Sequence, residues 1–281
     1  MKLLKIIFLS TFIISTSVSC NNTSESSSIS DVVSEVYYSE GLEFKYETSD
    51  GPSYWLVGVG TCQDSIIYVP PTYNNLPVTR IAKHAFYECD FITSVVISGD
   101  LFAIYDGAFT HSSIKEVVIQ GNVNQLSGFK YCSLLTDVGI SGEVKYLLSA
   151  FSNCYSLVNV TLPEGLLHIG HQSFKLCKSL KQIDIPDSVN TISFSAFENC
   201  VSLEKITLPL PLKELGRNAF ENCTSLKSVT LKENLRLIMN DAFAGCTSLT
   251  DVYFEGTREQ FEQITIFEGN DCLLNANIHF I

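Results

Sequence analysis

The chain has 281 residues, of which 46% are hydrophobic and 17% are charged, and its formal net charge is −12 at pH 7. The length and the hydrophobic content are those of a folded chain with a sizeable core. The acidic balance argues against a nucleic-acid partner and against adhesion to anionic lipid through a polybasic patch, because both contacts need a basic surface.

Residues 1–19 have the order of a secretory signal peptide. Lys2 and Lys5 precede an apolar run over residues 6–14, and small residues follow. The apolar run is too short to span a bilayer as a helix. Residues 17–20, SVSC, resemble a bacterial lipobox, although Ser17 stands where an aliphatic residue is usual. We expect cleavage before Cys20, attachment of lipid to that cysteine, and anchoring at the cell surface on a bacterial outer membrane; simple secretion is the alternative.

After Cys20 the chain is expected to form a flexible tether that runs to residue 36. Residues 21–30 are rich in Asn, Thr and Ser and contain almost no apolar side chains. Such a segment cannot bury enough surface to offset the entropy lost on ordering.

Residues 37–78 are predicted to form an N-terminal cap and the first coil. Residues 41–46 and 54–59 alternate like strands, and the turn residues 49–52 lie between them, so a β-hairpin is expected. Trp55, the only tryptophan, is expected to pack in this cap. Residues 73–77 are an insertion before the first regular repeat.

A repeat of 23 residues organises the chain from residue 79 to residue 254. Residues 156–178, 179–201, 202–224 and 225–247 follow one another without a gap. In the second of these, Ile183 and Ile185 alternate with polar residues as in a strand, and Pro186 ends it. Phe197 and Cys200 are three residues apart, which predicts a short helical or 3₁₀ turn that aims both inward. Each coil should therefore contain a strand, a corner, a second extended piece and a tight turn.

Stacking of about eight such coils would place like residues above like residues and build one continuous core. The predicted aromatic ladder is Phe86, Phe109, Phe129, Phe151, Phe174, Phe197, Phe220 and Phe243. The predicted strand ladder is Ile97, Ile119, Ile140, Leu162, Ile185, Leu208, Leu231 and Phe254.

The repeat pattern L-x-x-[IV]-x-[LI]-P…[IL]-G-x-x-[AS]-F-x-x-C resembles the leucine-rich repeats of the Bacteroides surface protein A (BspA-like) type, over roughly residues 41–281. The resemblance implies a leucine-rich-repeat solenoid, a β-rich horseshoe or superhelix with parallel strands, and a role in attachment to host matrix proteins and other cells. The pattern weakens where Phe109, Phe129 and Phe151 are only 20 and 22 residues apart, and where proline is absent after Ile97, Ile119 and Ile140. The middle coils should therefore be tighter or irregular.

Residues 255–281 are predicted to form a C-terminal cap. Residues 256–264 could form a short amphipathic helix, and residues 277–280 a final strand. The segment also resembles the end usual in the BspA-like family.

The repeated cysteines are predicted to be free and buried. Equivalent positions in parallel coils point the same way, which is poor disulfide geometry, so these thiols should behave as small apolar side chains. They are Cys132, Cys154, Cys177, Cys200, Cys223 and Cys246. Cys62 and Cys272 lie near opposite ends and are too far apart to pair.

No pattern in the sequence indicates catalysis. A Cys-x-x-Cys pair, a G-x-S-x-G motif and a dinucleotide fingerprint are all missing, and the five histidines are scattered. We therefore expect no enzyme activity, no metal site and no cofactor.

The outward side chains of the predicted strands form two polar, weakly charged stripes, with apolar residues such as Val96 and Val118 at the N-terminal end. At about 4.8 Å per coil they would span roughly 40 Å, which suits a protein or a long glycan better than a small molecule. The candidate ligand-binding residues are Asp137, Asn159, Thr161, Gln182, Asp184, Lys205, Thr207, Thr230 and Tyr253. The alternative is that these side chains only keep the surface soluble.

These features together predict a non-enzymatic lipoprotein for binding or adhesion at the cell surface, whose partner is a protein or glycan, for example host matrix. The alternatives are a structural scaffold, or an accessory subunit of an envelope or polysaccharide-handling complex.

Overall fold

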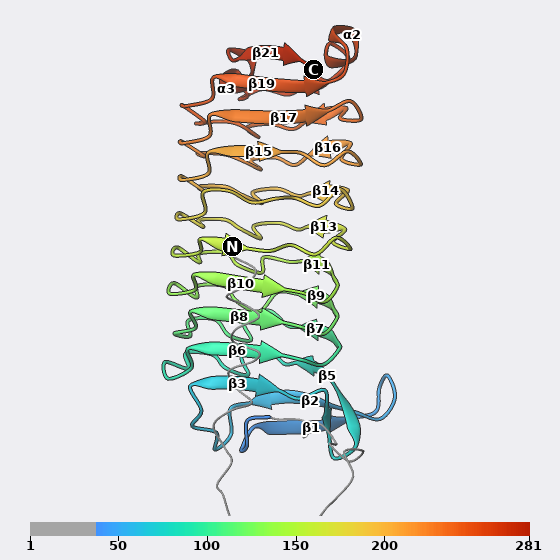
Figure 1. Cartoon of the computed structure of the whole chain (residues 1–281), viewed down its shortest axis with the longest axis vertical. Helices are drawn as coiled ribbons and strands as arrows, with labels where there is room; N and C mark the ends of the chain where they lie inside the picture. Colours follow the sequence, from blue (N-terminus) through green and yellow to red (C-terminus); the bar gives the residue numbers. More distant parts are fainter. Residues whose placement is uncertain (1–37) are drawn as a thin grey trace, which may run out of the picture. The chain divides into compact units, whose positions relative to one another are not determined.

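The computed structural model describes residues 38–281, which form a single stack of coils (Figure 1). The predicted signal peptide, the lipid attachment at Cys20 and the tether over residues 20–36 lie outside the described residues. The parallel β-solenoid is confirmed, and it contains about ten coils rather than about eight.

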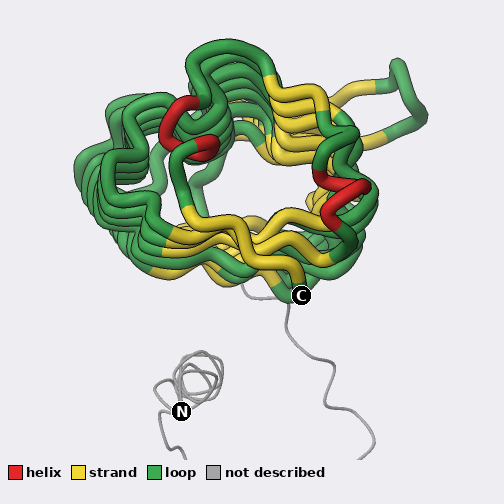
Figure 2. Tube along the Cα trace, turned by 90° about the horizontal axis from the view of Figure 1, so that it is seen from above, coloured by secondary structure: helices red, strands yellow, loops and turns green. Residues whose placement is uncertain are grey.

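Each coil crosses two opposite sides of the stack (Figure 2). One side carries a twelve-stranded sheet, which we call the long sheet. Its strands are β1 (Glu43–Glu47), β2 (Ser53–Gly58), β4 (Thr72–Tyr73), β5 (Leu76–Ile81), β7 (Leu101–Ile104), β9 (Val123–Leu126), β11 (Val144–Leu147), β13 (His168–Ile169), β14 (Thr191–Ile192), β16 (Glu214–Leu215), β18 (Leu237–Ile238) and β20 (Thr265–Ile266).

The opposite side carries two shorter sheets, which together we call the split face. Its strands are β3 (Ile66–Val69), β6 (Ser94–Ile97), β8 (Glu116–Ile119), β10 (Asp137–Ile140), β12 (Asn159–Val160), and then β15 (Lys205–Thr207), β17 (Ser228–Lys232), β19 (Asp251–Glu255) and β21 (Asn277–Phe280). All the pairs within each of these two sheets are parallel and in register. The predicted strand ladder is therefore formed from Ile97 to Ile140 and from Leu231 to Phe254, and it is interrupted at Leu162, Ile185 and Leu208, which lie in no strand.

Prolines explain why this face is split. In regular coils the residue after the strand donates its N–H to the preceding coil, as Gln120 does to the Ile97 carbonyl at 2.8 Å and Ser141 to the Ile119 carbonyl at 2.9 Å. Proline occupies the equivalent place in the next three coils and has no N–H to donate. These prolines are Pro163, Pro186 and Pro209.

One expectation about regularity is therefore wrong, and a second does not hold for this face. Residues 183–185 form no strand, because Pro186 cannot donate an N–H to the preceding coil and Pro209 of the following coil cannot donate one to this coil. On this face the middle coils without proline are the regular ones, since β6, β8 and β10 each have four residues, and their shortening lies outside these strands, as in the turns that follow β9 and β11. The residue count of a coil matters less to the ladder than its supply of N–H donors.

Stacked phenylalanine rings fill the core along the whole stack. Neighbouring rings from Phe86 to Phe243 have centroids 4.8 to 5.9 Å apart and planes within 24° of parallel. All eight rings are fully buried. No coil could bury its own ring alone, so this stack joins each coil to its neighbours.

The predicted helical or 3₁₀ turn at each phenylalanine is instead a pair of hydrogen-bonded turns. The Cys200 N–H donates to the Phe197 carbonyl at 3.1 Å, and Ser195 and Asn199 have φ of 56° and 61°. A left-handed third residue is typical of a type II turn rather than of a helix. Phe197 and Cys200 still point inward, as expected.

The buried thiols also make polar contacts. Six of them donate to the carbonyl of the ladder phenylalanine in the preceding coil at 3.1 or 3.2 Å, as Cys200 does to Phe174. All nine cysteines among residues 38–281 are free. The thiol therefore satisfies a buried carbonyl that an aliphatic side chain of the same size would leave with one partner fewer.

The two ends of the stack differ from its middle. β1 pairs antiparallel with β2, which forms the expected hairpin. The predicted helix over residues 256–264 shortens to α2 (Arg258–Phe261), which begins with a capping box between Thr257 and Gln260, and α3 (Asp271–Leu274) follows before β21. That these ends act as caps, with boundaries at residues 78 and 254, stays a prediction.

Asn270 terminates the hydrogen-bond ladder of the turns. In earlier coils the phenylalanine N–H donates to a carbonyl of the next coil, whereas the Phe243 N–H donates to Oδ1 of Asn270 at 3.0 Å. The Asn270 amide donates in turn to the carbonyls of Met239 and Phe267. A buried side chain thus replaces the missing coil.

We predict that Phe197→Ala lowers the free energy of unfolding by about 3–5 kcal/mol, the usual cost of emptying a buried aromatic site. Urea unfolding measures the loss, and hydrogen exchange should show that the adjacent coils open first. Phe194→Ala is the matched control, since that ring is 49% exposed. Equal losses in the two variants would contradict the stacked core.

Asn270→Ala should lower the free energy of unfolding by about 1–3 kcal/mol, because it leaves the buried Phe243 N–H without an acceptor. Hydrogen exchange at that amide should accelerate more than exchange at the Phe174 amide. Asn275→Ala, at an exposed asparagine five residues later, is the control and should change little.

We also predict that stability falls above about pH 9. Burial raises the pKa of Cys132 to about 11 and that of Cys200 to about 12. The unfolded thiol ionises near pH 8.5, whereas the folded thiol keeps its proton. The stabilisation that each buried thiol contributes to folding is therefore complete below about pH 8.5 and is lost as the pH rises towards 12. Between pH 8 and pH 10 the free energy of unfolding should fall by about 2 kcal/mol less in Cys200→Ala than in the parent chain. An unchanged difference would mean that this thiol does not titrate on unfolding.

Candidate functional site

The nine candidate residues all project outward from the split face. Six are exposed and three, namely Asp137, Thr230 and Tyr253, are half-buried. Their neighbours in the chain, such as Val138 and Val229, point into the core. The alternation inferred from the sequence is therefore confirmed, whereas the binding role of these residues stays a prediction.

Strand register arranges part of the candidate set into two columns. Asp137 pairs with Asn159 in one column, and the Asn159 amide donates to Oδ1 of Asp137 at 2.7 Å. Thr207, Thr230 and Tyr253 are successive partners in the other. Gln182 and Asp184 lie between β12 and β15 in the coil without a strand, so no ladder bond fixes their register.

A hollow of about 410 Å³ lies at this interruption, and we call it the proline hollow. Thr161 and Asp184 line it, together with two carboxylates that the sequence did not single out, Glu164 and Asp187. Pro163 and Pro186 have no backbone N–H, so neighbouring coils are not joined by a hydrogen bond at these positions. The strand ladder therefore does not close the face here. The regular spacing of these prolines was the signal that could have located the hollow.

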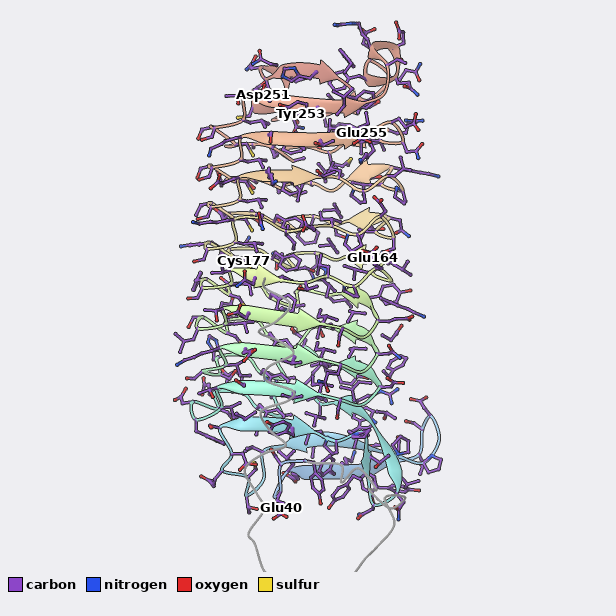
Figure 3. The ribbon with its side chains drawn as sticks, in the orientation of Figure 1. Glu40, Glu164, Cys177, Asp251, Tyr253 and Glu255 are labelled. Atoms are coloured by element: carbon purple, nitrogen blue, oxygen red, sulfur yellow. The ribbon has the colours of Figure 1, made fainter. Side chains whose placement is uncertain are left out.

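The C-terminal end of the face is held in place by contacts between coils. The Tyr253 ring stacks on His279 with centroids 4.9 Å apart, and Nε2 of His279 lies 2.7 Å from Oδ1 of Asp251. This hydrogen bond is the main reason that the pKa of Asp251 lies below its ordinary value. Asp251, Tyr253 and Glu255 follow one another along β19 (Figure 3).

Charged side chains of both signs occur along the split face, with the basic ones in its C-terminal coils. Nζ of Lys227 lies 3.0 Å from the carboxylate of Glu204, and this hydrogen bond lowers the pKa of Glu204. Burial, with a smaller effect from the charge of Asp137, raises the pKa of Glu116. The face therefore presents a mixed pattern rather than a field of one sign, and such patterns favour specificity over long-range steering.

No group of three or more His, Cys, Asp or Glu side chains within residues 38–281 is arranged to hold a metal ion. Three of the histidines are exposed and separate from the split face, namely His84, His111 and His171. In the same part of the chain, no helix has the length and apolar content needed to cross a membrane.

A family model for the BspA type Leucine rich repeat region matches residues 71–150 and 148–273, with six copies of the repeat. The chain belongs to this family. The matched residues contain the phenylalanine stack, the cysteine column and most of the three sheets, so the BspA-type repeat accounts for the architecture described above. No match was found among curated proteins.

Three solved structures of bacterial leucine-rich repeat proteins are similar to parts of this BspA-type chain. A protein of T. pallidum shares 25% identity over 76% of this chain and 83% of its own, with a TM-score of 0.43. A leucine rich cell surface protein from Faecalibacterium prausnitzii shares 20% identity over 82% of this chain and 97% of its own, with a TM-score of 0.35. A leucine-rich repeat protein from Bacteroides ovatus shares 18% identity over 87% of this chain and 99% of its own, with a TM-score of 0.39. Since all three TM-scores are below 0.5, the family assignment depends on the repeats themselves.

Proposed function

We propose that this BspA-type chain is a non-enzymatic binding protein of the bacterial cell surface, and that its split face docks a protein or a glycan. The observation that carries the proposal is the split face itself: polar side chains of mixed charge project from successive coils over one long side of the stack. A surface of this extent suits a macromolecule, whereas small ligands need a concave and mostly apolar pocket.

The packing behind the face supports a binding role. The inward neighbours of the candidate residues are buried, and contacts such as Asp137 to Asn159 connect one coil to the next. Side chains on such a support lose little conformational entropy when a partner binds, so ordering of the surface reduces the binding free energy only slightly.

Export and lipid anchoring form the second part of the proposal. The basic, apolar and small-residue order of residues 1–20 supports cleavage before Cys20 and acylation of that cysteine. The surface location that is typical of the BspA-type family agrees with it. A scaffold or an accessory subunit in an envelope or polysaccharide-handling complex would use the same face, but would stay in a stable complex instead of capturing an external ligand.

To test the face, Asp184, Thr207 and Thr230 are replaced together by Lys. The thermal midpoint should change little, because all three side chains point outward and surface substitutions are usually within about 0.5 kcal/mol each. Capture of matrix proteins or glycans from an immobilised panel should weaken. The control is Asn190→Lys with Glu214→Lys and Thr265→Lys, which makes the same total charge change beside the long sheet. Unaltered capture by the folded test variant would remove the split face as the docking surface.

To test the anchor, Cys20→Ala is expressed in a bacterial host. The variant should leave the membrane fraction, and the parent chain should take up labelled fatty acid. A parent chain that never incorporates the label would contradict lipidation, whereas a variant that remains membrane-bound would indicate another attachment.

A further inference from the structure

One turn between the long sheet and the phenylalanine stack is two residues short. Leu126 is in register with Ile104, and Leu147 with Leu126. Five residues lead from Ile104 to Phe109, but only three from Leu126 to Phe129 and four from Leu147 to Phe151. Because the rings still stack at 4.8 and 5.9 Å, the missing residues are taken from the turn at the surface and not from the core.

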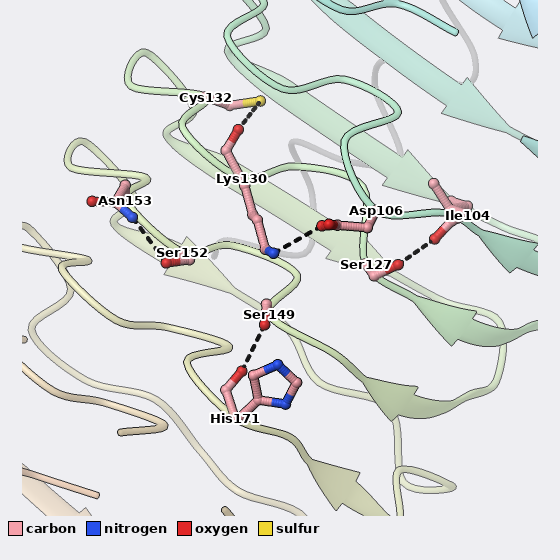
Figure 4. Close-up of polar contacts among 9 residues, drawn as sticks. All are labelled: Ile104, Asp106, Ser127, Lys130, Cys132, Ser149, Ser152, Asn153 and His171. Atoms are coloured by element: carbon pink, nitrogen blue, oxygen red, sulfur yellow. Dashed lines mark hydrogen bonds and ion pairs between the residues drawn. The ribbon is translucent and has the colours of Figure 1, made fainter. Parts of the chain in front are cut away.

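The short turn leaves a cavity of about 370 Å³, which we call the notch. Five successive coils contribute to it, from Lys83 at one end to His171 at the other. Figure 4 shows how its wall is fixed: the Ser127 hydroxyl donates to the Ile104 carbonyl at 2.7 Å and the Ser149 hydroxyl to the His171 carbonyl at 2.9 Å.

Several polar groups of the notch have no hydrogen-bond partner within the described chain. They are the amide of Gln125, the hydroxyl of Tyr105 and the ammonium group of Lys83. Donors and acceptors of this kind suit the hydroxyl groups of a sugar. The pocket is at the lower end of the volume range of ligand sites, so it would hold a single ring.

Two aromatic rings flank these polar groups and are themselves held by packing. The Tyr105 ring lies 5.7 Å from that of Trp55, and the His171 ring stacks on Phe194 at 5.5 Å and 7°. Aromatic rings with fixed orientation offer apolar contact beside polar groups, which is the combination that the C–H face and the hydroxyl edge of a sugar ring require.

The charge of the notch narrows the ligand class. Nζ of Lys130 pairs with Asp106 at 2.9 Å, while Lys83 has no acidic partner, so the notch has an excess of positive charge in a chain of net charge −12. We infer that the notch binds one carboxylate-bearing saccharide residue, such as the uronic acid of an anionic glycan. The site is separate from the split face and does not depend on the function proposed for it.

Residues 31–281, which include every coil described above, are titrated with sodium glucuronate, glucose and sodium acetate, and binding is followed by ligand-observed and amide NMR. Glucuronate should bind at least about tenfold more tightly than the other two and shift the amides of the notch, since the ring and the carboxylate each contribute. The inference is overturned if glucuronate does not bind, if glucose binds equally well, or if acetate binds equally well, which would indicate an adventitious anion only.

Two variants locate the binding. Lys83→Ala and Gln125→Ala should each weaken glucuronate binding at least about fivefold while the amide spectrum stays folded, because both side chains contribute to the surface and not to the core. Lys213→Ala removes an exposed lysine next to β16, outside the notch, and should have no effect. Glucuronate binding that is unchanged in both notch variants would also overturn the inference. Either result leaves the test of the split face unchanged, because that test uses different residues and different ligands.

Discussion

A backbone N–H that donates to the same carbonyl position in the neighbouring coil is the interaction on which the rest of the structure depends. At the turns it recurs from Phe174 to Ala196, from Phe197 to Ala219 and from Phe220 to Ala242, at 2.7 to 2.8 Å. These bonds fix the register between coils, and the stacking of rings and thiols follows from that register. Since a single coil has no core of its own, each bond also joins two incomplete units into a stable one.

The left-handed residues of the turns are a consequence of the same bond. Leu176 has φ of 61° and Tyr131 of 59°, although neither residue favours this region, and each donates its N–H to the next coil. Asparagine at the same position, as in Asn199, tolerates the conformation more readily. Stacking therefore imposes the turn, and the local preference of the residue has only a secondary effect.

This explains which features were predictable from the sequence. A period of 23 residues with Phe197, Cys200 and Ile183 at constant places predicts the stack, the buried ladders and the outward position of the split face. It does not distinguish a helical turn from two β-turns, because a spacing of three residues satisfies both. The proline hollow required counting N–H donors, and the notch required placing two missing residues in the turn instead of spreading them over the coil.

The two hollows occur where the repeat departs from regularity, and this follows from the geometry of a solenoid. A strict repeat places equivalent side chains above one another at the coil spacing and leaves no recess between them. A recess forms when a coil loses a hydrogen-bond donor, as at Pro186, or loses surface residues, as between Leu126 and Phe129. In both places the phenylalanine stack continues beneath the recess without a break. The core therefore tolerates surface changes that make one coil differ in shape from the next. Selective contacts of a repeat protein can be concentrated at the coils where the repeat is irregular.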